Sequence, residues 1–118
     1  GGMLIAHRHG RANAAHAPFR LMYFHRLAPL RPLAALGQAL AAFRVPASAA
    51  SREYYLAVDG AEAGQRCAAY DAIDIIGFAS SDAALRYAHA LDARAERRAL
   101  GGLVRGSDTL IAQRVRIC

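Results

Sequence analysis

The chain has 118 residues, of which 55% are hydrophobic and 20% are charged. It has 15 arginines, no lysine and nine acidic residues, which gives a net charge of +6. This length fits one domain, and the apolar content excludes a disordered basic tail. Two cysteines without a Cys-x-x-Cys motif exclude a disulfide scaffold and a cysteine-based structural metal site. No stretch has the pattern of a signal peptide or reaches the roughly 20 apolar residues of a membrane span, so we predict a cytoplasmic protein without membrane contacts.

Residues 1–18 show little periodicity and predict an extended N-terminal arm. We expect Gly1 and Gly2, which precede Met3, to be left over from cloning. The arm could add a short strand at Met3–Arg8. Its histidines (His7, His9 and His16) have no rigid element to fix their geometry, so the sequence predicts no metal site there. The folded domain is then expected over residues 19–118.

The first strand of this domain is predicted at Phe19–Arg26. Side chains of a strand alternate between two faces, and both faces are apolar in the middle of this one. One face holds Phe19, Leu21, Tyr23 and His25, and the other holds Arg20, Met22, Phe24 and Arg26. Both faces are therefore expected to be covered.

A helix follows, because Pro32 is suited to a first helical turn and Leu33, Leu36, Leu40 and Phe43 recur at helical spacing. Pro46 ends this segment. A second strand is predicted at Glu53–Asp59, where two tyrosines favour β structure. A connection over residues 60–70 leads to a third strand at Ala72–Ala79.

The last elements are a second helix and a fourth strand. Ser80, Ser81 and Asp82 are candidate N-caps for a helix that runs to about Leu100, where Gly101-Gly102 ends it. After a turn at Arg105–Thr109, the final strand is predicted at Leu110–Ile117.

The resulting order, strand–helix–strand–strand–helix–strand, predicts an α+β ferredoxin-like fold, βαββαβ, with a four-stranded antiparallel sheet and two helices on one face. The other face would carry apolar side chains such as Met22, Phe24, Tyr55 or Ile76, or the alternate set. Monomers rarely expose an apolar patch of several hundred Å². We therefore predict a homodimer through the open sheet face.

With this layout the chain resembles the EthD-like family (ethyl tert-butyl ether degradation protein-like) of the dimeric α+β barrel superfamily. The resemblance lies in Phe19–Arg26, Tyr70–Leu85 and Asp108–Ile117, and its most specific part is the run from Tyr70-Asp71 through Phe78 to Ala84-Leu85. It implies a small-molecule pocket between sheet and helices. Relatives include cofactor-independent monooxygenases, polyketide cyclases, lactone isomerases and haem-degrading proteins. The chain would then be an oxidoreductase or an isomerase/cyclase without nucleotide cofactor, or else a non-catalytic ligand-binding or dimeric assembly module.

His25 and Asp74 are the candidate catalytic residues. His25 ends the first strand, and Asp74 lies among isoleucines, where a carboxylate requires a partner such as Arg114. In the ferredoxin-like strand order these three residues could be cross-strand neighbours, and a histidine beside a carboxylate can act as a general base on an acidic carbon or a phenol. The alternative is a structural ion pair or an interface hydrogen bond. Candidate substrate contacts are Tyr23, Tyr54, Tyr55, His89 and Arg114.

Other functions have weaker support. His89 could ligate haem, but a single helical histidine is more often exposed or packed, and we predict no cofactor. Nucleotide-binding and hydrolase motifs are missing from the sequence. Arginine is spread over the whole chain and the third strand lacks the aromatic–basic pattern of RNA-binding relatives, so no nucleic-acid partner is predicted.

Overall fold

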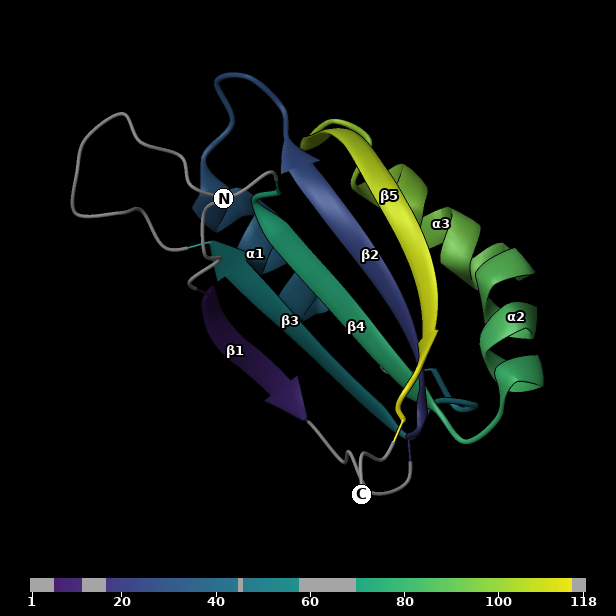
Figure 1. The fold of residues 1–118 in the computed structure, drawn as a ribbon. Helices are drawn as coiled ribbons and strands as arrows, with labels where there is room; N and C mark the ends of the chain where they lie inside the picture. Colours follow the sequence, from purple (N-terminus) through teal and green to yellow (C-terminus); the bar gives the residue numbers. More distant parts are fainter. Residues whose placement is uncertain (1–5, 12–16, 45, 58–69, 116–118) are drawn as a thin grey trace.

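A computed structural model describes residues 6–11, 17–44, 46–57 and 70–115. Figure 1 shows one sheet with helices behind it. The elements in chain order are β1 (Ala6–Arg11), β2 (Phe19–Leu27), α1 (Leu33–Ala42), β3 (Ser51–Ala57), β4 (Ala72–Phe78), α2 (Ser81–His89), α3 (Leu91–Ala99) and β5 (Val104–Gln113). His16 and most of the predicted 60–70 connection lie outside these residues. None of the helices in the described ranges is long and apolar enough to cross a membrane.

The sheet confirms the ferredoxin-like prediction and adds one strand to it. Its order is β1-β3-β4-β2-β5, and every neighbouring pair is antiparallel. Without β1, this order places the first strand of the domain between the third and the fourth, as predicted. The extra strand belongs to the N-terminal arm, where β1 pairs with β3 from Ala6 opposite Ala57 to Arg11 opposite Arg52.

Several element boundaries differ from the prediction, and the last strand ends at Gln113 and not at Ile117. The strand β3 begins at Ser51, and β5 begins at Val104 because its Gly- and Ser-containing start pairs with the end of β2 instead of forming a turn. The predicted second helix is interrupted at Ala90, whose extended backbone (ψ 158°) ends α2 and begins α3. The predicted N-cap is confirmed, since the Ser80 side chain accepts a hydrogen bond from the Ala83 amide at 3.1 Å.

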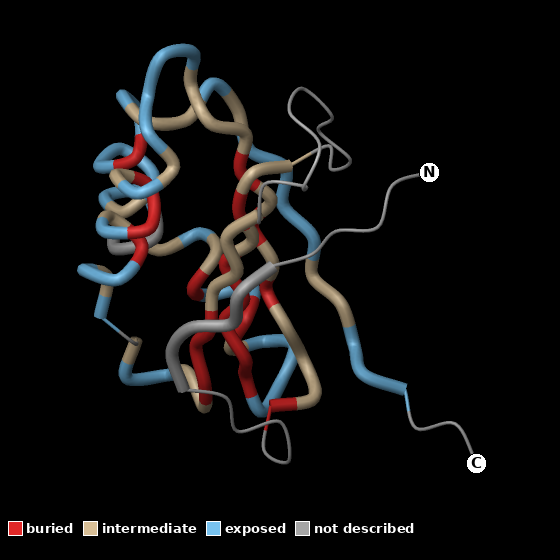
Figure 2. Tube along the Cα trace, turned by 90° about the vertical axis from the view of Figure 1, so that its left-hand side faces the viewer, coloured by how far each residue is buried: buried red, intermediate tan, exposed pale blue. Residues whose placement is uncertain are grey.

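Two apolar clusters lie between sheet and helices, and Figure 2 shows the buried residues along the strands and the inner sides of the helices. The cluster under α2 contains Leu21, Tyr23, Ile76, Phe78, Ala84 and Tyr87. The cluster under α1 contains Leu36, Leu40, Ala72 and Leu100.

The helix α1 approaches β3 closely at Gly37, where a Cβ would lie 2.7 Å from the Leu56 side chain, so only glycine fits without displacing Leu56. The clusters flank a polar centre on the same side of the sheet.

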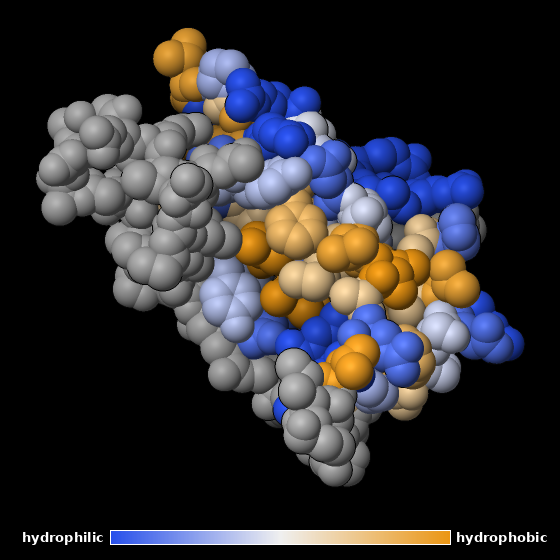
Figure 3. All heavy atoms as spheres, viewed as in Figure 1, coloured by the Kyte–Doolittle hydropathy of each residue, from blue (hydrophilic) through white to orange (hydrophobic). Residues whose placement is uncertain are grey.

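The open face of the sheet is apolar at its centre. Cross-strand partners place Met22 beside Ile75 and Leu110, and Phe24 beside Ile73. Figure 3 shows an apolar patch at the centre of this face, with polar side chains above and below it. One of the side chains predicted for this face, Ile76, lies instead on the helix side, where it is fully buried. The register therefore selects Ile73 and Ile75 for the open face.

Candidate functional site

Charged and polar side chains from neighbouring strands meet between the two apolar clusters. His25 on β2, Arg52 on β3 and Asp74 on β4 are each at most 4% exposed. The pairing aligns Tyr23, Asp74 and Tyr54 across the three strands, so these side chains point toward the helices. Buried polar groups require partners inside the protein, and the partners define the site.

The Arg52–Asp74 ion pair forms the centre of this site. Arg52 Nε and Nη2 donate to the two Asp74 carboxylate oxygens at 3.1 and 2.7 Å. Arg52 Nη1 donates to the Arg44 carbonyl at 3.2 Å and lies 3.6 Å from Glu96 Oε1. Burial alone would lower the pKa of Arg52, but the hydrogen bond and charge of Asp74 outweigh burial and leave this pKa raised. The fork-shaped guanidinium thus links the sheet to α3.

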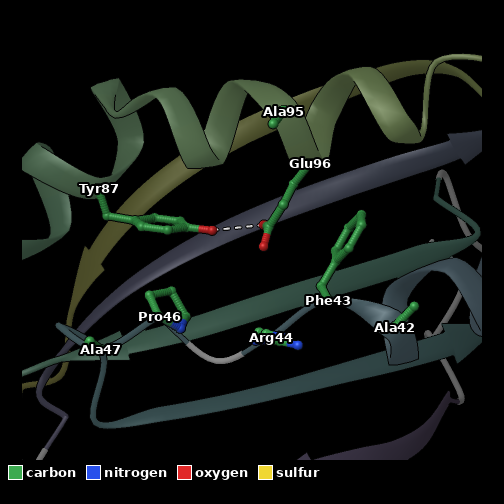
Figure 4. A pocket seen from close by; sticks show the side chains of 8 residues that line it. All are labelled: Ala42, Phe43, Arg44, Pro46, Ala47, Tyr87, Ala95 and Glu96. Carbon is green, nitrogen blue, oxygen red and sulfur yellow. Dashed lines mark hydrogen bonds between the residues drawn. The ribbon is translucent and has the colours of Figure 1, made fainter.

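A hollow of about 500 Å³ lies beside this ion pair, between the end of α1 and helices α2 and α3. Its walls are Ala42, Phe43, Arg44, Pro46, Ala47, Tyr87, Ala95 and Glu96, shown in Figure 4. The Tyr87 hydroxyl donates to Glu96 Oε2 at 2.7 Å across one side of the hollow. Burial and the Glu96 carboxylate raise the pKa of Tyr87, which keeps the phenol protonated. The hollow is therefore lined by aromatic and small apolar groups together with two charged residues, Arg44 and Glu96, and ligand pockets likewise combine apolar walls with a few polar groups.

Tyr23 and His25 form a second polar pair beneath the helices. Their rings lie nearly parallel, with centroids 6.2 Å apart. Ser107 Oγ lies 2.6 Å from His25 Nδ1, whereas His25 Nε2 and the Tyr23 hydroxyl have no hydrogen-bond partner among the described residues. Burial lowers the pKa of His25, against the opposing charge of Asp74, and burial raises the pKa of Tyr23. Both groups are thus neutral near pH 7 and retain unused hydrogen-bonding capacity.

The structure brings together only part of the predicted site. Asp74 pairs with Arg52 and not with Arg114, which follows β5 and whose amide donates to the Pro18 carbonyl at the opposite end of β2 from His25. The ring of Tyr54 shares the helix side with Tyr23, whereas Tyr55 points to the open face and donates to Glu53 at 3.0 Å. His89 is exposed at the end of α2.

Sequence reasoning missed Arg52, Tyr87 and Glu96. Arg52 lies just before the strand predicted at Glu53–Asp59, whereas β3 begins at Ser51 and includes it. Arg52 lies two residues before Tyr54 and therefore on the same face of the strand, and Asp74 needs a counter-ion. These two signals could have identified Arg52. Among the residues whose side chains are described, no group of three or more His, Cys, Asp or Glu could hold a metal ion.

Comparisons with known proteins support the fold. Neither a protein-family model nor a curated protein matches the sequence. A solved structure from Arabidopsis thaliana has a TM-score of 0.67 at 10% identity and covers 86% of this chain and 99% of its own. A dimeric ferredoxin-like protein of unknown function from Bacteroides fragilis has a TM-score of 0.58 at 12% identity, covering 80% and 94%. Another dimeric ferredoxin-like protein of unknown function, from Thermobifida fusca, has a TM-score of 0.53 at 15% identity, covering 89% and 98%. At these identities the likeness concerns the fold alone.

Proposed function

We propose that this protein is an EthD-like small-molecule-binding protein whose ligand enters the hollow between α1 and α2–α3 and reaches Tyr23 and His25. The observation that carries this proposal is a pair of buried atoms, the Tyr23 hydroxyl and His25 Nε2, that have no hydrogen-bond partner in the part of the chain that the structure describes. An unsatisfied buried polar group costs about 1–3 kcal/mol. A ligand that offers hydrogen-bond partners to both atoms would recover this energy. Tyr23 packs in the same cluster as Tyr87, which lines the hollow.

Proton transfer is the chemistry that this pair suits best. When Nδ1 of His25 carries the hydrogen and donates to Ser107 Oγ, Nε2 presents a free lone pair. His25 would then accept a proton from an acidic carbon or a phenol, while the neutral Tyr23 hydroxyl donates to the oxygen on which negative charge develops. The charge of Asp74 favours the imidazolium that forms. Such a step belongs to an isomerase, a cyclase or an EthD-like oxidoreductase that works without a nucleotide cofactor.

This activity can be tested by hydrogen exchange. Phenols and 1,3-diketones in D₂O would be followed by NMR, and the exchange of their acidic C–H protons would be compared with and without protein. Wild type is expected to accelerate exchange of at least one probe, and His25→Gln is expected to remove the acceleration. His89→Gln is the matched control because His89 is exposed on α2. Equal acceleration by wild type and His25→Gln would contradict the role of His25.

We further propose that the protein forms a homodimer through the open sheet face. Met22, Phe24 and Ile73 are only partly covered, and Leu110, which lies beside Met22 on the edge strand β5, is 51% exposed. A second copy would remove this patch from water at about 25 cal/mol per Å². Two of the similar structures are described as dimeric. The polar rim, which includes the Arg26–Asp108 ion pair, would surround the apolar centre as in other interfaces.

The dimer can be tested by light scattering on two matched variants. Leu110→Asp is expected to yield monomers, because it places a charge in the apolar part of the interface. Leu85→Asp changes a leucine of similar exposure on α2, in the helix layer, and is expected to leave the dimer intact. A monomeric wild type at micromolar concentration, or an unchanged dimer in Leu110→Asp, would contradict the proposal.

The second candidate function is a non-catalytic ligand-binding or dimeric assembly module. It is favoured by the burial of Tyr23 and His25, which are 4% and 2% exposed. In this case the polar centre holds the sheet and helices together, and the open face is the functional surface. Loss of dimerisation in Leu110→Asp together with no effect of His25→Gln on any probe would favour this module.

A further inference from the structure

The carboxylate oxygens of Asp74 and Glu96 at the site already have partners within this chain. Both Asp74 oxygens accept from Arg52, and the two Glu96 oxygens face Arg52 and the Tyr87 hydroxyl. A cationic ligand would compete with Arg52 for these carboxylates. The oxygens of both acids are therefore already engaged, and a ligand is more readily held by groups other than these carboxylates.

A hydrogen-bond donor, the Tyr23 hydroxyl, and a positive charge, that of Arg97, belong to neighbouring side chains. The Arg97 guanidinium lies over the Tyr23 ring, 5.8 Å from its centroid, and Nη2 donates to the Ala88 carbonyl at 3.0 Å. This exposed arginine reaches from α3 across the end of α2 and covers the buried ring. Among the charges acting on Tyr23, that of Arg97 has the largest effect and opposes the rise in the tyrosine pKa. The hydroxyl of this ring, which has no partner among the described residues, remains protonated and can donate.

Resting on the proposed function above, we propose that the ligand of this site is an anion with a flat apolar body. Its negatively charged oxygen, a carboxylate or a phenolate, accepts from the Tyr23 hydroxyl and is paired with Arg97. Its apolar body lies in the hollow against Phe43, Pro46 and Tyr87. Arg44 on the far wall adds a second positive charge. Hydrogen bonds to a charged group are stronger than neutral ones, so the charge of the ligand decides its affinity.

Two probes of equal shape separate this inference from the proposed function. The anion 2-naphthoate and the neutral 2-naphthamide would be titrated against the full chain, with naphthalene fluorescence and ligand-detected NMR as readouts. Wild type is expected to bind 2-naphthoate about tenfold more tightly than 2-naphthamide. Arg97→Gln and Tyr23→Phe are each expected to remove most of this difference, and added salt is expected to weaken naphthoate binding alone.

Three controls locate the effect. Arg94→Gln changes another exposed arginine of α3 and is expected to leave both affinities unchanged. Ala95→Trp fills the hollow and is expected to abolish binding of both probes. Thermal unfolding of Arg97→Gln verifies that the variant is folded, because Arg97 also contacts Ala88.

The outcomes distinguish the preference for an anion from the existence of the ligand pocket. Equal binding of both probes, lost in Ala95→Trp, would overturn the anion preference and leave the pocket in place. Preference for naphthoate that persists in Arg97→Gln would also overturn the role assigned to Arg97. Binding of neither probe at millimolar concentration would contradict the pocket itself and the inference with it.

Discussion

The buried Arg52–Asp74 pair gives the sharpest test of how this fold is held together. Asp74→Ala removes both carboxylate oxygens and leaves the Arg52 guanidinium buried, with a side chain only 5% exposed. Breaking a buried ion pair by removing one partner typically costs about 3–5 kcal/mol. Here Arg52 keeps Glu96 at 3.6 Å and the Arg44 carbonyl at 3.2 Å. We therefore expect a loss near the lower end, about 3 kcal/mol in the free energy of unfolding.

Urea unfolding at one fixed protein concentration measures this loss, because a dimer would make stability depend on concentration. With an m-value of about 1–3 kcal/mol/M, the unfolding midpoint is expected to fall by roughly 1–3 M. A double variant, Arg52→Met with Asp74→Leu, replaces the pair with apolar side chains. It is expected to be clearly more stable than Asp74→Ala, because no buried charge remains.

The exposed pair between Arg26 and Asp108 is the matched control. Asp108 is 56% exposed at its side chain, so solvent screens the interaction and Asp108→Ala is expected to cost far less than Asp74→Ala. A loss below about 1 kcal/mol for Asp74→Ala, with an unchanged m-value, would refute the reasoning. Such a result would mean that Glu96 or water replaces the carboxylate without a net cost.

Three further predictions concern pH, strain and capping. Burial lowers the pKa of His25 from its ordinary 6.5, so the unfolded chain binds a proton more readily. Stability should fall as pH drops below 6.5, by up to about 1.4 kcal/mol per pH unit, and His25→Gln but not His89→Gln should flatten this fall in urea titrations. Leu30 is fully exposed with φ 64°, so Leu30→Gly should gain about 0.5 kcal/mol, and a lower melting temperature would contradict the strain argument. Ser80→Ala should cost about 1 kcal/mol by calorimetry, and no loss would mean that the cap of α2 contributes nothing.

The order of strands and helices in the domain was predictable because local patterns determine it. Helical spacing of leucines located α1, and Pro32 and Ser80 marked the starts of α1 and α2. The break at Ala90 could not be predicted, since alanine is the best helix former and neither glycine nor proline marks the position. Likewise, the Gly106-Ser107-Asp108 segment has the composition of a turn, and only its pairing with β2 makes it a strand.

The site was predictable only in part, because it depends on which residues meet across strands. The sequence identified Tyr23, His25 and Asp74 on central strands. It indicated that Asp74 needs a counter-ion, but the choice of Arg52 over the other arginines depends on the register of β3 against β4 and on the exact start of β3. Glu96 and Tyr87 reach the site through the relative orientation of α2 and α3, which follows from the break at Ala90.

Successive side chains of β4 point alternately to the helix side, where the proposed ligand binds, and to the open face, where the proposed dimer forms. Asp74 and Ile76 point to the helices, whereas Ile73 and Ile75 point to the open face. A substitution on one side of this strand leaves the other side chemically unchanged, since neighbouring side chains point in opposite directions. The same alternation holds on β2 and β5, where Tyr23 points to the helices and Leu110, the partner of Met22, points to the open face. Leu110→Asp should therefore alter assembly without altering the affinity for 2-naphthoate, and Tyr23→Phe should do the reverse. If both variants changed both properties, the ligand site would depend on the dimer, and the sheet would be the element that couples them.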